Sequence, residues 1–315
     1  NEKLMTTEVA NMIIEKIDRI LNDNIFEGIN IHYFGGEPLL NIPVLIYLDE
    51  NIKKITDKIG IVYKAFLTTN GSMLSKELLQ KVKFSSIQLT FDGLEKTHDR
   101  LRVSDHFHFK EEIELIENIM NFSQAKVLLR TNICKENKDE IIALHKYIFE
   151  KFGNERIEIN PNRTIKYHQD DSFEMLSVQE YAEVAYQIKL LWSEQKGKFE
   201  LPVPRSTPCK FPYGNAYAIS PEGYCTFCSG SMDQEKKYFF DVDIENKKMF
   251  SEIPTPPQKI QIKFLRTHSA GSKFLQWRAK FELHNLYFRR SSQPKAPGSQ
   301  RLQITSIISA QIQPC

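Results

Sequence analysis

Cysteine is scarce in this chain: it accounts for five of 315 residues, and the count is odd. Because the spacing shows no paired pattern across the chain, a disulfide framework like that of small secreted domains is excluded. The Cys-x-x-Cys at Cys225 and Cys228 is an exception, and in a reducing compartment it favours metal or redox chemistry. We therefore expect a cytoplasmic protein.

Long apolar runs and a strong net charge are also absent. No apolar stretch reaches membrane-spanning length and no signal peptide opens the chain, so we expect no membrane partner. The first residue is Asn1 rather than Met, which indicates a processed, trimmed or partial product. The net charge is only +2, and residues 259–315 hold ten of the 42 basic residues but one of the 40 acidic ones. The first 258 residues are therefore acidic, and we expect no nucleic-acid partner.

The hydrophobic pattern predicts strands separated by helices. The expected strands are 29–34, 61–67, 87–91, 125–133 and 156–160. The expected helices are 5–22, 41–58, about 75–82, about 110–121, 138–151 and 174–195. This alternation predicts an α/β fold built from right-handed βαβ units around a parallel sheet. Because the chain opens on a helix, we expect a preceding strand to be missing.

Polar residues follow each expected strand, at the edge where parallel sheets bind ligands. After the first strand, Gly35 and Gly36 let a ligand approach the bare backbone, Glu37 adds a carboxylate and Pro38 fixes the exit of the turn. This combination suits a small ligand that carries an ammonium group. Ordinary turn and capping chemistry is the alternative for each loop taken alone, and an interstrand salt bridge is the alternative for Arg130.

The order of these motifs resembles that of radical S-adenosylmethionine enzymes, above all the branch with a C-terminal SPASM domain. The resemblance rests on Gly-Gly-Glu-Pro, Thr-Asn-Gly, Thr-x-Asp-Gly with His-Asp-x-x-Arg, and a late Cys-rich hairpin, over about residues 1–240. It implies a partial (β/α)6 parallel barrel over residues 1–200 and a small C-terminal Cys-bearing hairpin domain over 201–245. The composition changes after Pro257, and we expect residues 246–315 to be a divergent or non-native basic tail in which Ser291–Gln300 is disordered.

The resemblance also implies a site for S-adenosylmethionine (AdoMet). Its glycines and Glu37 would hold the methionyl amine, Thr90 would lie near the ribose or carboxylate, and Asp92 would order its loop. Arg130 or Asn132 would lie near the cofactor carboxylate. The whole implied cofactor-binding set is Gly35, Gly36, Glu37, Pro38, Asn70, Thr90, Asp92, Arg130 and Asn132.

The cysteines match the family pattern in part. Cys209, Gly223 and Cys228 fit the ligand spacing of an auxiliary [4Fe–4S] cluster, and Cys225 is an additional thiol. The Cys-x3-Cys-x2-Cys loop that holds the family's catalytic [4Fe–4S] cluster is not in the sequence, nor are most of the later cysteines. We therefore expect a fragment that is inactive alone and that has an incomplete auxiliary site.

By resemblance, the parent protein generates a 5′-deoxyadenosyl radical to modify a peptide or protein side chain, with flavodoxin or ferredoxin as electron donor. Sulfatase maturation is less favoured, because Ser229 stands where those relatives have an acidic residue. A degenerate homologue that only binds a peptide or AdoMet is an alternative. An unrelated barrel whose Cys-x-x-Cys binds zinc is another.

Overall fold

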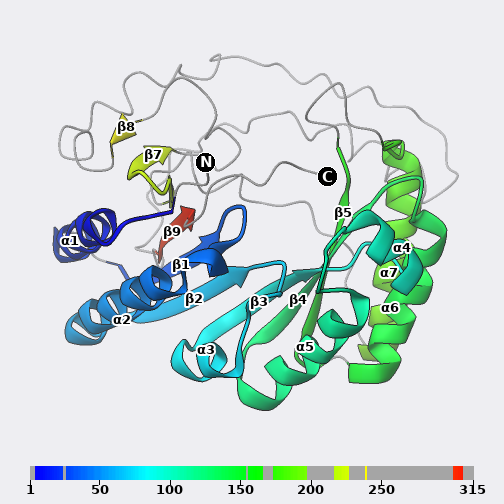
Figure 1. The fold of residues 1–315 in the computed structure, drawn as a ribbon, viewed down its shortest axis with the longest axis horizontal. Coiled ribbons are helices and arrows are strands. Elements are labelled where there is room, and N and C mark those ends of the chain that lie inside the picture. Colours follow the sequence, from blue (N-terminus) through cyan, green and yellow to red (C-terminus); the bar gives the residue numbers. More distant parts are fainter. Residues whose placement is uncertain are drawn as a thin grey trace, which may run out of the picture.

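The protein folds around one curved, open sheet whose outer face is covered by helices (Figure 1). The structure is a computed structural model, and it describes residues 4–23, 26–153, 155–165, 173–196, 216–226, 238–239 and 301–307. Its strands are β1 (Gly28–Phe34), β2 (Val62–Thr68), β3 (Phe84–Thr90), β4 (Lys126–Ile133), β5 (Ile157–Arg163), β6 (Ala216–Ile219), β7 (Tyr224–Thr226), β8 (Tyr238–Phe239) and β9 (Arg301–Ile307). Its helices are α1 (Thr7–Asp23), η1 (Pro38–Asn41), α2 (Ile42–Ile59), α3 (Lys76–Lys81), α4 (Glu95–Leu101), α5 (Phe109–Phe122), α6 (Lys138–Phe152) and α7 (Val178–Lys196).

The strand order is β5-β4-β3-β2-β1-β9-β6-β7-β8. The pairs from β5 to β6 are all parallel, and β7 and β8 continue the sheet in antiparallel fashion. The five parallel strands expected from the sequence are therefore confirmed, each with a helix after it. The parallel α/β fold is confirmed as well.

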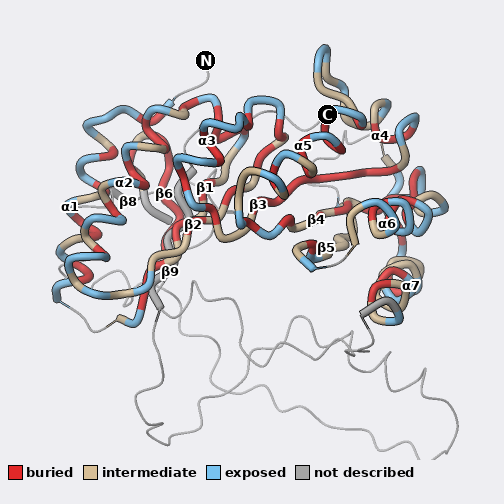
Figure 2. Tube along the Cα trace, turned by 90° about the horizontal axis from the view of Figure 1, so that it is seen from below, coloured by how far each residue is buried: buried red, intermediate tan, exposed pale blue. Residues whose placement is uncertain are grey.

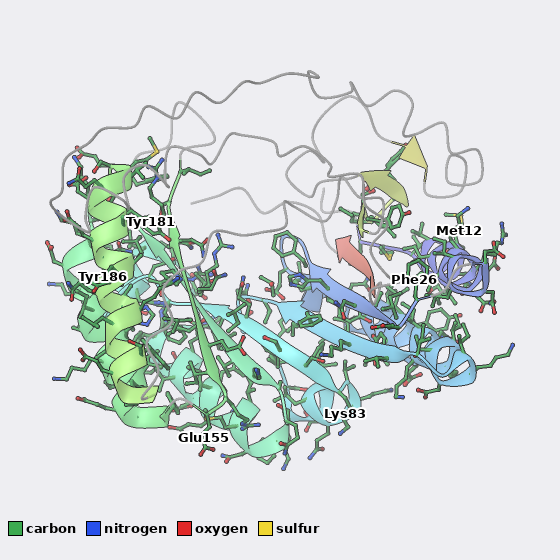
Figure 3. All side chains as sticks on the ribbon, turned by 180° about the vertical axis from the view of Figure 1, so that it is seen from behind. Met12, Phe26, Lys83, Glu155, Tyr181 and Tyr186 are labelled. Atoms are coloured by element: carbon green, nitrogen blue, oxygen red, sulfur yellow. The ribbon has the colours of Figure 1, made fainter. Side chains whose placement is uncertain are left out.

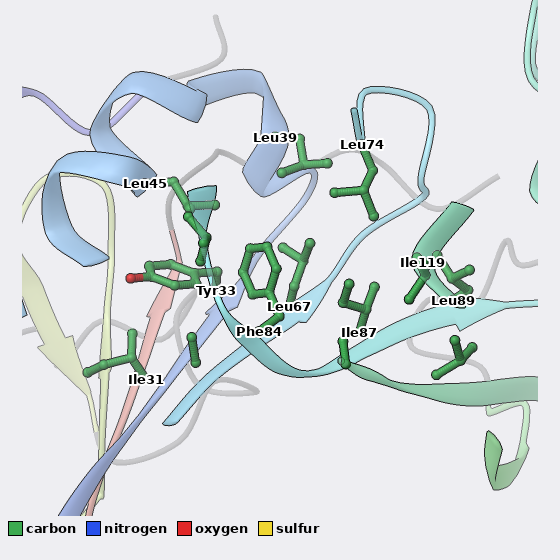
Figure 4. Close-up of a cluster of buried hydrophobic side chains, with 14 of the residues drawn as sticks. Ile31, Tyr33, Leu39, Leu45, Leu67, Leu74, Phe84, Ile87, Leu89 and Ile119 are labelled. Carbon is green, nitrogen blue, oxygen red and sulfur yellow. The ribbon is translucent and has the colours of Figure 1, made fainter. Parts of the chain in front are cut away.

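Alternating burial along the strands explains why the helices cover one face. On β1 the side chains of Ile29, Ile31 and Tyr33 are fully buried, while those between them are only partly buried. The same alternation recurs on β2 and β4, and the apolar side chains of β1 to β4 form a continuous core against the helices (Figure 4). Because side chains alternate across a strand, the remaining positions share the opposite, concave face of the sheet.

The buried residues follow the strands and the inward sides of the helices, whereas the outward sides of α1 and α2 are exposed (Figure 2). Glycine ends α2, since Gly60 has a φ of 81° and its N–H donates to the Thr56 carbonyl. Ser75 caps α3 by accepting from the Leu78 N–H. Gly60 thus ends the helix before β2 begins, and Ser75 starts the helix after β2 ends.

The two ends of the sheet are closed differently. Tyr181 and Tyr186 on α7 lie at the β5 end, whereas Met12 and Phe26 lie at the α1 end (Figure 3). The Tyr181 hydroxyl donates to the Pro161 carbonyl of β5 at 2.7 Å. At the α1 end, Gly223 of the β6–β7 turn lies close to the Met12 side chain. None of the helices within the described ranges is long and apolar enough to cross a membrane.

Three elements differ from the sequence-based expectation. On the side of β1 away from β2, the neighbouring strand is β9, which comes from the segment expected to be a tail. It pairs with β1 in parallel from Gly28 to Phe34. The expected hairpin forms as β6 and β7, but β6 pairs with β9 and so extends the main sheet. Helix α4 carries the His-Asp-x-x-Arg residues and was not expected. Its seven residues are too few for a periodic apolar pattern to stand out.

Candidate ligand site at the carboxyl rim of the sheet

The loops after β1 to β5 form one rim, and hydrogen bonds join each loop to the next. The Glu37 carboxylate joins the ends of β1 and β2, and the Thr69 N–H donates to the Gln88 carbonyl of β3. Asp92 joins β3 to β4, and the Thr164 N–H donates to the Ile133 carbonyl between β5 and β4. The sequence-predicted residues after the first four strands therefore lie along one edge of the sheet.

Glu37 is turned into the protein rather than outward. Its side chain is 2% exposed and accepts hydrogen bonds from the Thr69 hydroxyl at 2.7 Å, the Asn70 N–H at 2.7 Å and the Leu39 N–H at 3.0 Å. Burial raises the pKa of this carboxyl, and these hydrogen bonds and Arg102 oppose the rise. The carboxylate therefore fixes the loop, and Pro38 follows it at the start of η1.

The two glycines before Glu37 leave the backbone of this loop accessible. Gly35 has a φ of 149°, a conformation that side chains with a Cβ rarely adopt, and Gly36 is exposed. A glycine pair at this position carries no side chains of its own, so a ligand at the rim can approach the carbonyl groups of this loop. Such carbonyls are suitable acceptors for an ammonium group.

Asp92 organises the loop after β3. One carboxylate oxygen accepts from the Asn132 N–H at 3.0 Å, and the other accepts from the Arg102 guanidinium at 3.3 Å. The Asn137 side chain donates to the carbonyls of both Asp92 and Asn132 at 2.8 Å. The ends of β3 and β4 are therefore held together by the side chains of Asp92 and Asn137.

Arg130 and Asn132 lie on the concave face of β4, two residues apart. The Arg130 Nε donates to the Asn132 Oδ1 at 2.9 Å. Arg130 is half-buried, and none of the carboxylates in the described ranges forms an ion pair with it. Thr90 is buried and lies beside Arg130 in the β3–β4 register. The rim thus carries a cation suited to a carboxylate ligand.

The Asn70 side chain serves its own turn. Its Oδ1 accepts from the Ser72 N–H at 3.0 Å and from the Ser72 hydroxyl at 2.8 Å, while its backbone N–H holds Glu37. Gly71 follows with a φ of 87°. The Thr-Asn-Gly motif therefore shapes the β2 loop and fixes the β1 loop at the same time.

A cavity of about 290 Å³ lies on the concave face below this rim. Its described lining comprises Asn30, His32, Phe66, Leu67, Thr68, Ser86, Gln88 and Leu128. Burial lowers the pKa of His32 to about 4, so this imidazole is neutral at pH 7, and its Nε2 lies 2.8 Å from the Thr68 hydroxyl. The buried Asn30 Oδ1 accepts no hydrogen bond from any residue that the structure describes. The cavity wall is thus uncharged, and it combines apolar side chains with several polar groups.

The predicted metal ligands cannot be placed. Cys209 and Cys228 lie outside the residues that the structure describes, and of Cys225 only the backbone, in β7, is described. Cys134 is buried, and burial raises the pKa of its thiol. Within the described ranges no group of three or more His, Cys, Asp or Glu side chains could hold a metal ion. The auxiliary-cluster hypothesis stays a prediction.

Sequence reasoning missed Glu112 and the structural role of Asn137. Glu112 is 2% exposed within the buried stripe of α5, between Phe109 and Ile116. A carboxylate inside an apolar helical stripe is a readable signal for a buried functional group. Asn137 directly precedes α6 and could have been recognised as a cap position.

Solved structures with bound AdoMet resemble this chain. One is native anSMEcpe with bound AdoMet, with a TM-score of 0.58 and 15% identity over 76% of this chain and 71% of that one. Another is native anSMEcpe with bound AdoMet and the Cp18Cys peptide, with a TM-score of 0.59 and 17% identity over 79% and 73% of the two chains. A third is SuiB from Streptococcus suis bound to S-adenosylmethionine, with a TM-score of 0.52 and 17% identity over 76% and 58%. This chain shares their fold.

The fold implied by the radical S-adenosylmethionine resemblance is therefore confirmed. No protein-family model matches the sequence, and no curated protein matches it either. At 15–17% identity the likeness extends to the fold and not to the chemistry. The residues of the rim have to carry the functional argument.

Proposed function

We propose that this protein binds AdoMet at the rim and that it is a radical S-adenosylmethionine protein acting on a peptide or protein side chain. The observation that carries the proposal is the arrangement of the rim. Bare carbonyls of a glycine pair follow β1, and the guanidinium of Arg130 projects from β4. An amino acid group has one ammonium and one carboxylate, and these two features match its two charges.

The rim residues fit AdoMet in the following way. The carbonyls of Gly35 and Gly36 accept from the methionyl ammonium, while Glu37 holds their loop in place. Arg130, oriented by Asn132, binds the carboxylate. The hydroxyl of Thr90 lies beside Arg130 in the register and is available to the same ligand. Asp92 maintains the distance between β3 and β4.

An iron–sulfur cluster is the other group that the fold implies, and it would supply the electron that cleaves AdoMet. The residues that the structure describes do not fit one, because Cys134 is the sole cysteine side chain among them and it is buried. The proposed roles of the rim residues therefore do not depend on a cluster.

A peptide partner is supported by a structural neighbour, since anSMEcpe is seen with both AdoMet and a peptide. In this chain the cavity on the concave face lies below the rim and opens among uncharged polar groups. An uncharged side chain of a peptide fits such a lining better than a charged one, because burying an unpaired charge there is costly. An electron donor of the flavodoxin or ferredoxin type belongs to the same proposal.

Equilibrium dialysis of the full chain with radiolabelled AdoMet tests the proposal. We expect Arg130→Met to raise the Kd about 10- to 100-fold, because losing a charge-assisted hydrogen bond costs about 1.5–3 kcal/mol. Lys126→Met is the matched control, since it removes a cation from the start of the same strand, where Lys126 pairs with Glu158. We expect this control to change the Kd less than about twofold. Equal effects of the two variants, or no binding to the wild type, would contradict the proposal.

A further inference from the structure

A buried histidine–glutamate pair lies directly behind the rim. His98 of α4 and Glu112 of α5 are 3% and 2% exposed, and the His98 Nε2 lies 3.2 Å from the Glu112 Oε2. The imidazole packs against Phe91 and Phe109, whose ring centroids lie 5.4 and 5.7 Å from it and 5.7 Å from each other. The three rings form one cluster, and this apolar packing fixes the position of the imidazole.

The hydrogen bonds around His98 determine where its proton resides. The Asp92 N–H donates to the His98 Nδ1 at 3.4 Å, so this nitrogen must carry a lone pair. The single proton of a neutral imidazole then lies on Nε2, where it can be donated to Glu112. A protonated Nδ1 would face the Asp92 N–H, donor against donor, and the contact would be lost.

Glu112 depends on this one partner. Its other oxygen, Oε1, is buried and has no hydrogen-bond partner among the residues that the structure describes. Burial raises the pKa of the Glu112 carboxyl, the hydrogen bond from His98 and the charge of Arg102 oppose the rise, and the charge of Asp92 adds to it. The carboxylate of Asp99 on α4 is engaged elsewhere, by the Phe109 N–H at 2.8 Å. Within the described part of the chain, His98 is thus the donor that orients Glu112.

The pair acts on the rim through Asp92. When His98 holds the Asp92 N–H, the Asp92 carboxylate is placed to accept from the Asn132 N–H and from Arg102. Asn132 in turn orients Arg130. A continuous chain of hydrogen bonds therefore runs from Glu112 through His98, Asp92 and Asn132 to the cation at the rim.

We propose that His98 and Glu112 are positioning residues: the Nε2–H tautomer of His98, fixed by Glu112, holds the Asp92 loop in the conformation that orients Asn132 and Arg130. The inference rests on the proposed function as far as the ligand is concerned. The hydrogen-bond chain itself can be tested without any ligand.

Nitrogen NMR of the full chain labelled with ¹⁵N-histidine tests the tautomer directly, with His98 assigned by the loss of its signals in His98→Asn. We expect an unprotonated Nδ1 and a protonated Nε2 at pH 7. Glu112→Gln retains an acceptor and keeps this tautomer, whereas Glu112→Met lets both tautomers populate. An Nδ1-protonated His98 in the wild type would overturn the proposal.

Two substitutions of His98 separate positioning from packing. In His98→Asn the amide oxygen stands near the place of Nδ1 and can still accept from Asp92. In His98→Gln the amide reaches toward Glu112 and leaves Asp92 without its acceptor. We expect hydrogen exchange of the Asn132 amide to stay within about threefold of the wild type in His98→Asn and to quicken more than about tenfold in His98→Gln.

We expect the affinity for AdoMet to follow the same order: His98→Gln should have a higher Kd than His98→Asn. If the wild type binds no AdoMet, the proposed function fails, while the exchange measurement still decides on the positioning pair. If both variants change Asn132 exchange equally, in proportion to their thermal stability, His98 is a packing residue and the proposal is wrong.

Discussion

Arg102 supplies a positive charge to three buried carboxyl groups behind the rim. It forms an ion pair with Asp92, and its charge opposes the rise in pKa that burial imposes on Glu37 and Glu112. Removing one partner of a buried ion pair costs more stability than removing one partner of a surface pair. Arg102 should therefore contribute more to stability than a cation in a surface pair does. The His-Asp-x-x-Arg motif thus supplies both the imidazole and the guanidinium of this cluster.

We predict that Arg102→Met lowers the free energy of unfolding by about 1–3 kcal/mol, because the buried Asp92 carboxylate loses a donor and Glu37 and Glu112 lose a favourable charge. Arg100→Met is the control two residues away, where Arg100 forms an exposed pair with Glu136 at 2.9 Å. An exposed pair contributes about 0–1 kcal/mol. Urea denaturation of both variants measures the difference, and equal losses would show that Arg102 has no special role.

His145 predicts how stability depends on pH. It is fully buried between the Thr131 hydroxyl and the Trp192 indole, and burial lowers its pKa to about 3. Its ordinary pKa in the unfolded chain is about 6.5. Because the folded pKa is depressed, the stabilisation is present above pH 6.5 and is lost as the pH falls from 6.5 toward 3.

We therefore expect His145→Gln to lose less stability than the wild type on acidification between pH 6.5 and pH 4, although it is less stable at pH 7. His106→Gln, at an exposed histidine, is the control and should follow the wild type. Thermal unfolding at several pH values gives the slopes. A His145→Gln slope as steep as that of the wild type would mean that His145 does not titrate between the two states.

Among the elements, the β2–α3 loop contains a glycine that has no room for a Cβ atom. Gly71 has a φ of 87°, and a Cβ there would lie 2.6 Å from the Leu115 Cδ2 of α5. Gly60, at the end of α2, has a similar φ of 81° but nothing within 4 Å of its Cβ position. The two positions therefore differ in packing and share their backbone conformation.

We predict that Gly60→Ala costs about 1–2 kcal/mol, from the left-handed backbone alone. Gly71→Ala should cost more, by about 1–3 kcal/mol, because it also overpacks the contact with α5. Chemical denaturation of the pair isolates the packing contribution. If both variants lose the same stability, the Leu115 side chain of α5 does not limit the space at Gly71.

The parallel strands were predictable because each is a short apolar run with a helix after it. β3 begins at Phe84, before its predicted start at residue 87, because Ser85 and Ser86 hide the alternation. β9 could not be predicted, since its pairing with β1 joins residues far apart in the sequence and leaves no local signal. Its sequence neighbourhood, rich in Ser and Gln, favoured disorder instead.

At the scale of the whole molecule, the fold places every rim motif on one edge, as the parallel arrangement requires. The sequence predicted which loops form the rim, because their glycines and polar residues follow the strands. It could not predict that Glu37 turns inward, because that depends on the Thr69 hydroxyl and the Asn70 amide, which β2 brings next to β1. The pair formed by His98 and Glu112 likewise depends on the packing of α4 against α5.

The measurement that tests the central claim most directly is hydrogen–deuterium exchange of the full chain with and without saturating AdoMet. The account predicts slower exchange in the four rim segments 35–39, 70–72, 90–93 and 130–133, with no change in α7 or in the β6–β7 hairpin. Unchanged exchange at the rim in the presence of AdoMet, or protection confined to other segments, would contradict it.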